Sequence, residues 1–163
     1  MELTLKALGP AYRIVCRDAR SGKVLGVTSG FVVSPLRLMH CDALQVFTKG
    51  LAGDEGSRIR GGVLGLGLLL GGATFSYGWR CGCMRAEILA IDDDEAWHER
   101  LVRYYKHFGF VPVYRVTGGR LADLPHMLVW GGAGTRMDAD IPGMLQRWTR
   151  AIRAARQQPT APP

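Results

Sequence analysis

The sequence has little of what would place it in several large protein classes. It has four cysteines in 163 residues, and the one close pair, Cys81 and Cys83, is spaced too tightly for a zinc knuckle and has no second pair to complete it. Reduced thiols in a reducing compartment are therefore expected. There is no internal repeat, and neither a secretory signal nor an Arg- and Ser-rich transit peptide heads the chain, so we expect a cytoplasmic protein.

Only one uncharged run is long enough to raise the question of a membrane helix. Residues 61–79 carry no charge and lie between Arg60 and Arg80. The run contains many glycines and several hydroxyl groups, so its mean hydropathy is modest, and the segments on either side look like strands that need a covering helix. The sequence therefore favours a helix buried against a sheet, without membrane contact.

Length and composition are those of one globular domain. With 47% hydrophobic residues, a chain of 163 residues can bury a substantial core. We expect the domain to span residues 1–156 and residues 157–163 to form a disordered tail. The net charge of +7 indicates an anionic partner, such as the phosphates of a cofactor, nucleic acid or a ribosomal surface.

Several segments have the alternation or the short apolar run of a β-strand. These segments are 11–17, 23–33, 36–48, 86–91, 111–116 and 126–130. Residues 49–60 are polar and rich in glycine, so we expect them to form a loop between the third strand and the first helix.

Apolar residues at helical spacing predict three helices. The first opens with the Gly-rich turn 61–67, and the second ends at Gly109. Asp138 or Asp140 is expected to cap the last helix. The Gly-rich segment 131–134 looks like a phosphate loop, but no Lys-Ser or Lys-Thr comes after it at the P-loop spacing, so we interpret it as a bend.

The central block of helix, strand and helix carries two short motifs. Gly65-Leu66-Gly67 stands at the start of the first helix, and Tyr105 stands four residues before Gly109-Phe110 at the end of the second. Together they resemble the GNAT superfamily of acetyl-CoA-dependent N-acetyltransferases, whose pyrophosphate signature is an Arg or Gln followed by x-x-Gly-x-Gly or Ala. The likeness covers roughly residues 40–130. The sequence of the central block looks most like GNAT-domain proteins of cyanobacteria and plant plastids, which makes the plastid stroma an alternative location.

This resemblance implies a fold, a cofactor and a site. The fold is a single α/β (α+β) domain with a mixed, mostly antiparallel sheet flanked by helices. Acetyl-CoA is the implied co-substrate and an amine of a small molecule or protein the acceptor; a homodimer is left open, and neither nucleic acid nor a membrane is expected. The pantetheine arm would fill a gap between parting strands and bond to the backbone at Val46. The pyrophosphate would lie on backbone amides at Leu64, Gly65, Leu66, Gly67 and Leu68.

The sequence departs from the family pattern in two places. Gly62 occupies the Arg or Gln position of the signature, although Arg58 and Arg60 lie just upstream. The loop 49–60 is also longer than the few residues usual in the family. The alternative to a cofactor site is that the glycines only permit close packing between helix and sheet.

The implied chemistry is direct attack of a neutral amine on the thioester, with coenzyme A leaving as a thiolate. By resemblance, Tyr105 stabilises that thiolate. Because a tyrosine titrates near about 10 and a thiol near about 8.5, full proton transfer is uphill by roughly 2 kcal/mol, and a hydrogen bond is the expected role. The alternative is that Tyr105 is a core residue of an amphipathic helix.

Three further side chains are candidates for the site. His98 stands seven residues before Tyr105, where many relatives have an Asn that contacts the cofactor; the alternative is a solvated histidine. Glu87 and Asp42 could relay a proton from the amine through water, or they could be ordinary paired acids. The run of acids 92–94 is better explained by helix capping than by a metal, because no ligand set accompanies it.

A second hypothesis is a catalytically silent GNAT-like domain that binds a ribosome or RNA through a basic face. Gly62 in the signature and the lack of one clear general base favour this hypothesis, whereas Tyr105 and the glycine cluster favour an enzyme. The basic face would be a row on the last helix, Arg147, Arg150, Arg153 and Arg156. Because no aromatic residues are interleaved with these arginines on that face of the helix, a solvated surface is the preferred interpretation.

Overall fold

The computed structural model describes residues 1–47, 62–117 and 130–157, without the side chains of 62–64, 151, 152 and 154–157. Several sequence predictions therefore lie outside the described residues. They are the loop 49–60 with Arg58 and Arg60, most of the strand 126–130, the tail after Gln157, and the side chains of Ile152 and Arg156.

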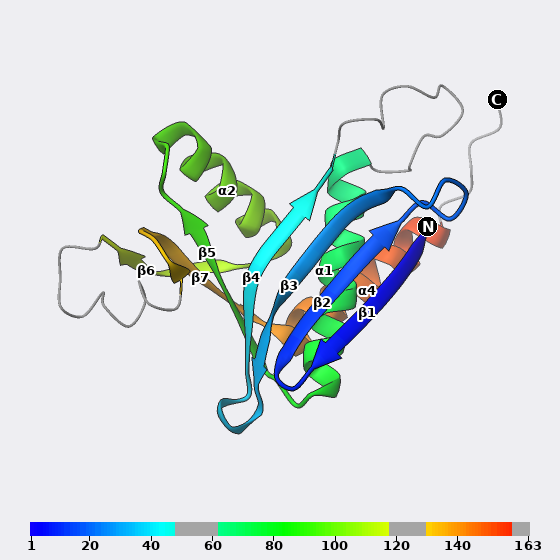
Figure 1. Cartoon of the computed structure of the whole chain (residues 1–163), viewed down its shortest axis with the longest axis horizontal. Coiled ribbons are helices and arrows are strands. Elements are labelled where there is room, and N and C mark those ends of the chain that lie inside the picture. Colours follow the sequence, from blue (N-terminus) through cyan, green and yellow to red (C-terminus); the bar gives the residue numbers. More distant parts are fainter. Residues whose placement is uncertain (48–61, 118–129, 158–163) are drawn as a thin grey trace.

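The centre of the protein is a seven-stranded sheet in the order β1-β2-β3-β4-β5-β7-β6 (Figure 1). Among the described strands only β4 and β5 are parallel neighbours, and the other neighbours are antiparallel. This is the mixed, mostly antiparallel sheet that the sequence predicts. The strands are β1 (Glu2–Leu8), β2 (Ala11–Arg17), β3 (Val24–Val33), β4 (Leu38–Val46), β5 (Arg85–Ile91), β6 (Val111–Val116) and β7 (Gly134–Asp140).

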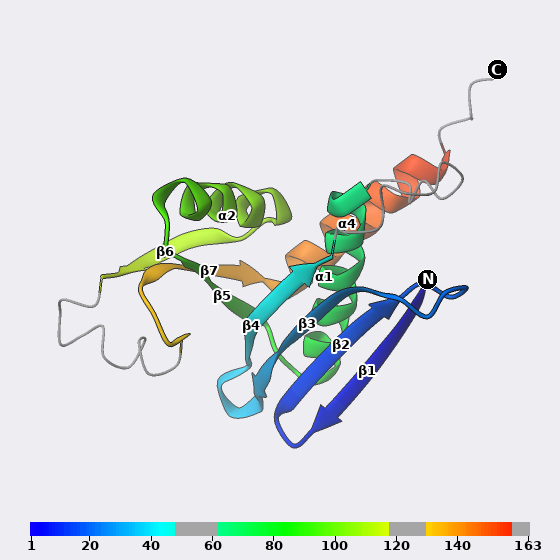
Figure 2. The ribbon, with the colours of Figure 1, turned by 45° about the horizontal axis from the view of Figure 1, so that its top comes forward.

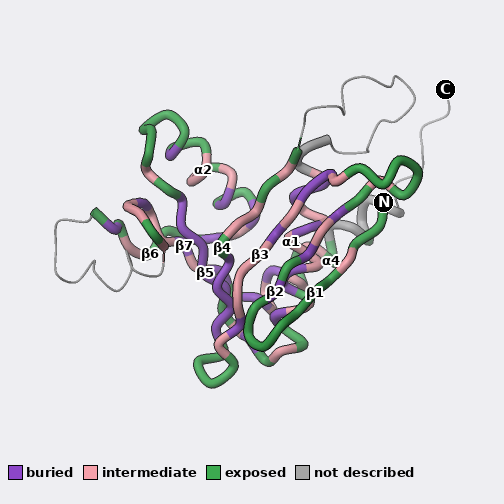
Figure 3. Tube along the Cα trace, viewed as in Figure 1, coloured by how far each residue is buried: buried purple, intermediate pink, exposed green. Residues whose placement is uncertain are grey.

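The described α-helices all pack against one face of this sheet (Figure 2). They are α1 (Gly62–Arg80), α2 (Glu95–Phe108) and α4 (Ile141–Gln157), while a short 3-10 helix, η1 (Ser34–Leu36), joins β3 to β4. Aromatic rings connect the α-helices: Phe75 of α1 stacks on Trp148 of α4 at 5.4 Å between ring centroids, and Phe108 of α2 meets Trp148 at 6.3 Å. The buried segments of Figure 3 gather where these helices cover β2 to β5 and β7. Among the described residues, no helix is long and apolar enough to cross a membrane.

The helix ends agree with the predicted capping chemistry. The Asp94 carboxylate accepts a hydrogen bond from the Trp97 amide at 2.8 Å, and Gly109 ends α2 in the left-handed conformation with φ 97°. Of the two candidate caps for α4, Asp140 is correct, because its carboxylate accepts a bond from the Gly143 amide at 2.8 Å. Asp138 instead belongs to a charged cluster on the sheet.

Two strands differ from the sequence prediction, for different reasons. β1 is absent from the sequence prediction, although residues 2–8 alternate as a strand does. It is an edge strand whose side chains are mostly exposed. The described strand that pairs with β6 is β7, whereas the sequence predicts a partner at 126–130, most of which lies outside the described residues. The predicted bend 131–134 is confirmed only at residues 131–132, since β7 begins at Gly134. The sequence of β7 does not have the apolar pattern expected of a buried strand. The polar side chains of Arg136 and Asp138 face a polar cluster rather than solvent.

Candidate active site

The two parallel strands part in the middle of the sheet. β4 pairs with β5 only from Leu38↔Arg85 to Cys41↔Ile88. Beyond this point β4 continues to Val46, which pairs with Gly26 of β3, and β5 continues to Ile91, which pairs with Gly134 of β7. From Asp42 onwards, β4 therefore has no strand partner on its β5 side among the described residues, and backbone groups there are available to a ligand.

A β-bulge marks the point of parting. In the pairing of β3 with β4, Ser29 is opposite Ala43 and Gly30 is opposite Cys41, so Asp42 has no partner. The bulge also reverses which side chains face the helices: Cys41 does so before it and Leu44 after it. Bulges of this kind are frequent beside active sites, where they redirect a strand.

Tyr105 lies on the helix side of the parting point. It is 7% exposed and lines a cavity with Cys41 of β4, Ile88 of β5 and Thr74 of α1. Its hydroxyl makes no hydrogen bond to the described residues. Burial raises the pKa of Tyr105, and the neighbouring Cys41 and Tyr104 raise it further, so the phenol stays protonated and can donate a hydrogen bond.

The cavity beside Tyr105 is narrow. Its volume is about 20 Å³, which is space for one water molecule and not for a pantetheine arm. Burial raises the pKa of the Cys41 thiol in its wall to about 12, with smaller contributions from Glu87 and Cys83 and an opposing hydrogen bond from Tyr12. The group is therefore a thiol rather than a nucleophilic thiolate, which disfavours an acetyl-cysteine intermediate.

The opposite face of the parting point carries a charged cluster. His40 of β4 is the register partner of Glu87 of β5, and the His40 Nδ1 lies 3.0 Å from the Glu87 Oε1. The Arg136 guanidinium forms an ion pair with the other Glu87 oxygen at 3.1 Å and two hydrogen bonds with the Asp138 carboxylate, at 3.0 and 3.1 Å. Arg85 lies 3.5 Å from Asp138. Glu87 is thus a paired, buried acid at the site, as one of the two sequence interpretations held.

The charges in this cluster keep Glu87 ionised. Burial raises the pKa of the Glu87 carboxyl, but the hydrogen bond with His40 and the positive charges of Arg136 and Arg85 together outweigh it, so that the net pKa is lowered. Sequence reasoning missed His40 and Arg136. The pairing of residue 40 with residue 87 depends on a parallel register that no local pattern reveals.

The lowered pKa of Glu87 predicts a pH-dependent stability. The contribution is fully present above the ordinary glutamate value of 4.5 and is lost as the pH falls through the lower value of the folded protein. We expect the free energy of unfolding of the wild type to decrease more steeply below about pH 4.5 than that of Glu87→Gln. Urea denaturation over a pH series measures both slopes, and parallel slopes would contradict this role of the charged cluster.

The glycine signature lies within α1 rather than in a turn before it. Because α1 begins at Gly62, the amides without an intrahelical partner are those of its first turn, which includes Leu64 and is followed by Gly65. Leu66 is fully buried, and a Cβ on Gly67 would lie 2.2 Å from the Tyr104 hydroxyl oxygen. Gly67 therefore does allow close packing, of α1 on α2, and the pyrophosphate site at residues 64–68 stays a prediction.

The other predicted cofactor contacts lie in different settings. Val46 is half-buried at the end of β4, beyond the parting point, where an arm bonded to the backbone is expected. His98 is 6% exposed, so the alternative of a solvated histidine is wrong. Its Nδ1 lies 3.1 Å from the Ile91 carbonyl and its Nε2 3.2 Å from the Thr135 hydroxyl. A cofactor bond from His98 would have to replace one of these contacts.

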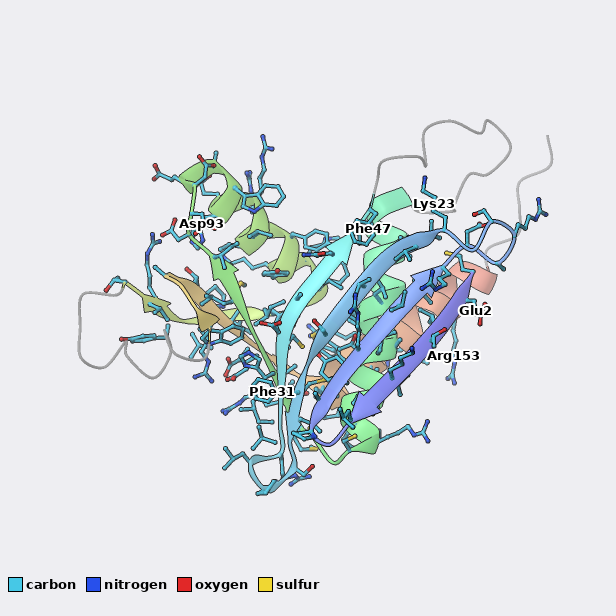
Figure 4. All side chains as sticks on the ribbon, viewed as in Figure 1. Glu2, Lys23, Phe31, Phe47, Asp93 and Arg153 are labelled. Atoms are coloured by element: carbon cyan, nitrogen blue, oxygen red, sulfur yellow. The ribbon has the colours of Figure 1, made fainter. Side chains whose placement is uncertain are left out.

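The acidic run after β5 has separate structural roles. Asp94 caps α2, and Asp92 forms an ion pair with Arg115 of β6. No group of three or more potential metal ligands occurs in the part of the chain that the structure describes. Figure 4 shows Asp93 just beyond the end of β5, on the side of the molecule away from Phe31 of β3.

The parting of two parallel strands, each followed by a helix on the same face, is the architecture of the GNAT acetyltransferases, and this chain has the GNAT fold. The fold is similar to that of a spermidine N-acetyltransferase from Vibrio cholerae, with a TM-score of 0.59 and 13% identity over 85% of this chain and 70% of that one. It is also similar to nourseothricin acetyltransferase (TM-score 0.55, 15% identity, 82% and 66% of the chains) and to an aminoglycoside 6'-acetyltransferase of type Ii (0.56, 14%, 81% and 70%). No protein-family model matches the sequence, and no curated protein matches it.

Proposed function

We propose that this protein transfers an acetyl group from acetyl-CoA to an amine by direct attack. The observation that carries the proposal is the open side of β4 from Asp42 to Val46, with the first turn of α1 after it and Tyr105 beside it. The pantetheine arm would bond to this side of β4, and the pyrophosphate would take the unpaired amides at the start of α1. No cation stands at Gly62, so the helix dipole and these amides would carry more of the phosphate binding.

Acetyl-CoA binding tests this proposal directly. At about 100 times its dissociation constant, the cofactor should add roughly 2.7 kcal/mol to the free energy of unfolding, a rise of about 5–10 °C in melting temperature for a chain of this size. Gly65→Val should weaken binding severely, because a bulky side chain would crowd the backbone beside the first turn. Calorimetry that shows unaltered affinity in a folded Gly65→Val variant would contradict the proposed pyrophosphate site.

A second function has one observation in its favour. The cavity at Tyr105 has no space for the pantetheine arm, which is consistent with a GNAT-like domain that binds a partner without catalysis. Arg147, Arg150 and Arg153 are exposed on α4 and would be its contact surface. The thermal-shift measurement separates the two functions, since only the enzyme requires acetyl-CoA to bind.

A further inference from the structure

One ring nitrogen of His40 is buried without a partner. The His40 side chain is 1% exposed, and its ring lies between Phe31 of β3, stacked at 4.3 Å between centroids, and Trp130, at 3.9 Å. Its Nε2 is buried and has no hydrogen-bond partner among the described residues. A buried polar atom of this kind is costly and calls for a specific explanation.

The partners of His40 determine which nitrogen carries the proton. Glu87 is ionised and held by Arg136, so its carboxylate can only accept a hydrogen bond. The proton of a neutral His40 must therefore reside on Nδ1, where it is donated to Glu87 across 3.0 Å. The free lone pair is then on Nε2, the atom that lacks a partner. The ring is oriented and prepared to accept a proton there.

The position of His40 in the sheet relates this nitrogen to the proposed reaction. His40↔Glu87 is the register pair directly before Cys41↔Ile88, the last pair before the strands part. Because successive side chains of a strand point to opposite faces, Cys41 and Ile88 line the Tyr105 cavity while His40 and Glu87 face the other way. A thioester at the parting point would thus have Tyr105 on one side of the sheet and His40 on the other.

We propose that His40 Nε2 is the base that removes a proton from the acceptor amine, and that Glu87 is a positioning residue that holds the imidazole. This inference rests on the proposed acetyl transfer. It replaces Glu87, the base expected from the sequence, because both Glu87 oxygens are already engaged by His40 and Arg136. The basic group of the site is then neutral imidazole, and the bond to Glu87 stabilises the imidazolium that forms.

The protons of the reaction balance with His40 as the base. Because His40 Nε2 is itself buried, an acceptor ammonium gives one proton to it through an intervening water and becomes a neutral amine. Its lone pair forms the C–N bond to the acetyl carbon, and the C–S bond breaks with its electrons on sulfur. The second nitrogen proton passes through solvent to the thiolate. Until then, Tyr105 stabilises the thiolate by its hydrogen bond. The imidazolium then releases its proton to solvent, so the products are amide, coenzyme A thiol and one proton.

Removal and chemical replacement of the imidazole test the assignment. The assay uses acetyl-CoA, a panel of primary aliphatic and aromatic amines, and detection of free thiol. We expect His40→Ala to lower kcat by about 10² or more with little change in acetyl-CoA affinity, and His40→Gln, which can keep the bond to Glu87, to lower it comparably. Added imidazole should restore at least about tenfold of the His40→Ala rate by binding between Phe31 and Trp130, and should not restore His40→Gln.

A matched control is available on α2. His107 is exposed, so His107→Ala should keep the wild-type rate and should not respond to imidazole. Glu87→Gln should retain part of the activity. Its residual rate should not respond to added imidazole either, because the His40 ring is still present in this variant. A His40→Ala enzyme that is folded, binds acetyl-CoA and acetylates amines at the wild-type rate would overturn the assignment, as would a loss that imidazole leaves unchanged in both folded variants.

A spectroscopic measurement covers the case in which no amine of the panel is acetylated. Nitrogen NMR of labelled histidine should find the neutral His40 ring with its proton on Nδ1, and Glu87→Gln should weaken that preference. A proton on Nε2 in the wild type would overturn the inference irrespective of turnover. If acetyl-CoA itself fails to bind, the proposed function fails, and that result is distinct from either outcome at His40.

Discussion

Replacing Tyr105 with phenylalanine is expected to lower kcat and kcat/KM together by about 10² or more. The phenol acts only when negative charge collects on sulfur, so its loss removes roughly 2.7 kcal/mol of transition-state stabilisation. The ring is retained, and the Tyr105 hydroxyl has no hydrogen-bond partner among the described residues, so melting temperature and acetyl-CoA affinity should barely change. Because burial raises the pKa of Tyr105, donation of a hydrogen bond is the expected contribution rather than complete proton transfer.

Tyr104→Phe is the internal control for this experiment. The Tyr104 ring packs on Phe108 at 4.6 Å between centroids, and its hydroxyl lies against Gly67 of α1 rather than in the cavity. It should turn over at nearly the wild-type rate. Equal rates for both variants and the wild type would leave Tyr105 as a core tyrosine and remove it from the mechanism.

A large loss of stability is expected from a change in the sheet at the parting point. Gly30→Ala should lower the free energy of unfolding by at least about 2 kcal/mol. A Cβ at this position would lie 2.0 Å from the His40 carbonyl oxygen and 2.9 Å from the Tyr12 hydroxyl oxygen. The carbonyl belongs to the backbone of β4, so it can move only if the bulge moves with it.

Gly132→Ala provides the matched comparison. A Cβ there meets nothing within 4 Å, and its backbone does not need a positive φ, so its stability should stay near that of the wild type. Urea denaturation of the two variants measures the difference. A Gly30→Ala protein as stable as Gly132→Ala would show that β3 and β4 can separate at the bulge without cost, and would contradict a rigid parting point.

The two faces of the sheet have different roles in the proposed mechanism. The helix face supplies Tyr105 and packs the core, while the face without described helices supplies His40, Glu87 and Arg136. A seven-stranded sheet in which only β4 and β5 are parallel creates one parting point, and the adjacent pairs His40↔Glu87 and Cys41↔Ile88 are directed to its two sides. In the proposed mechanism, Tyr105 and His40 therefore lie on opposite sides of one thioester and cannot exchange a proton with each other directly.

The type of fold is implied by the resemblance to the GNAT superfamily, whereas most of the local elements could be predicted from the amino-acid order alone. Short-range chemistry decides these, since the period of the apolar residues, the Asp94 cap and the Gly109 terminus act within one helix or strand. The burial of Tyr105 could be predicted because it stands on a helix whose apolar face must turn inward, whereas its catalytic role is implied by the resemblance and stays a prediction. The cofactor contact at Val46, at the end of a strand expected to part from its neighbour, is likewise implied by the resemblance.

The combination of distant segments is visible only in the folded chain. The bond between His40 and Glu87 joins residues 47 positions apart, and Arg136 enters the cluster from β7, a strand whose polar alternation disguises it. The sequence leaves open whether His98 contacts a cofactor or is solvated, and the folded chain shows it buried by contacts with Ile91 and Thr135. Gly67 is needed for the close approach of the Tyr104 hydroxyl to α1, a contact between two helices that the apolar pattern of one helix does not predict. Register and packing depend on the whole sheet, so these relations arise only when all the strands are in place.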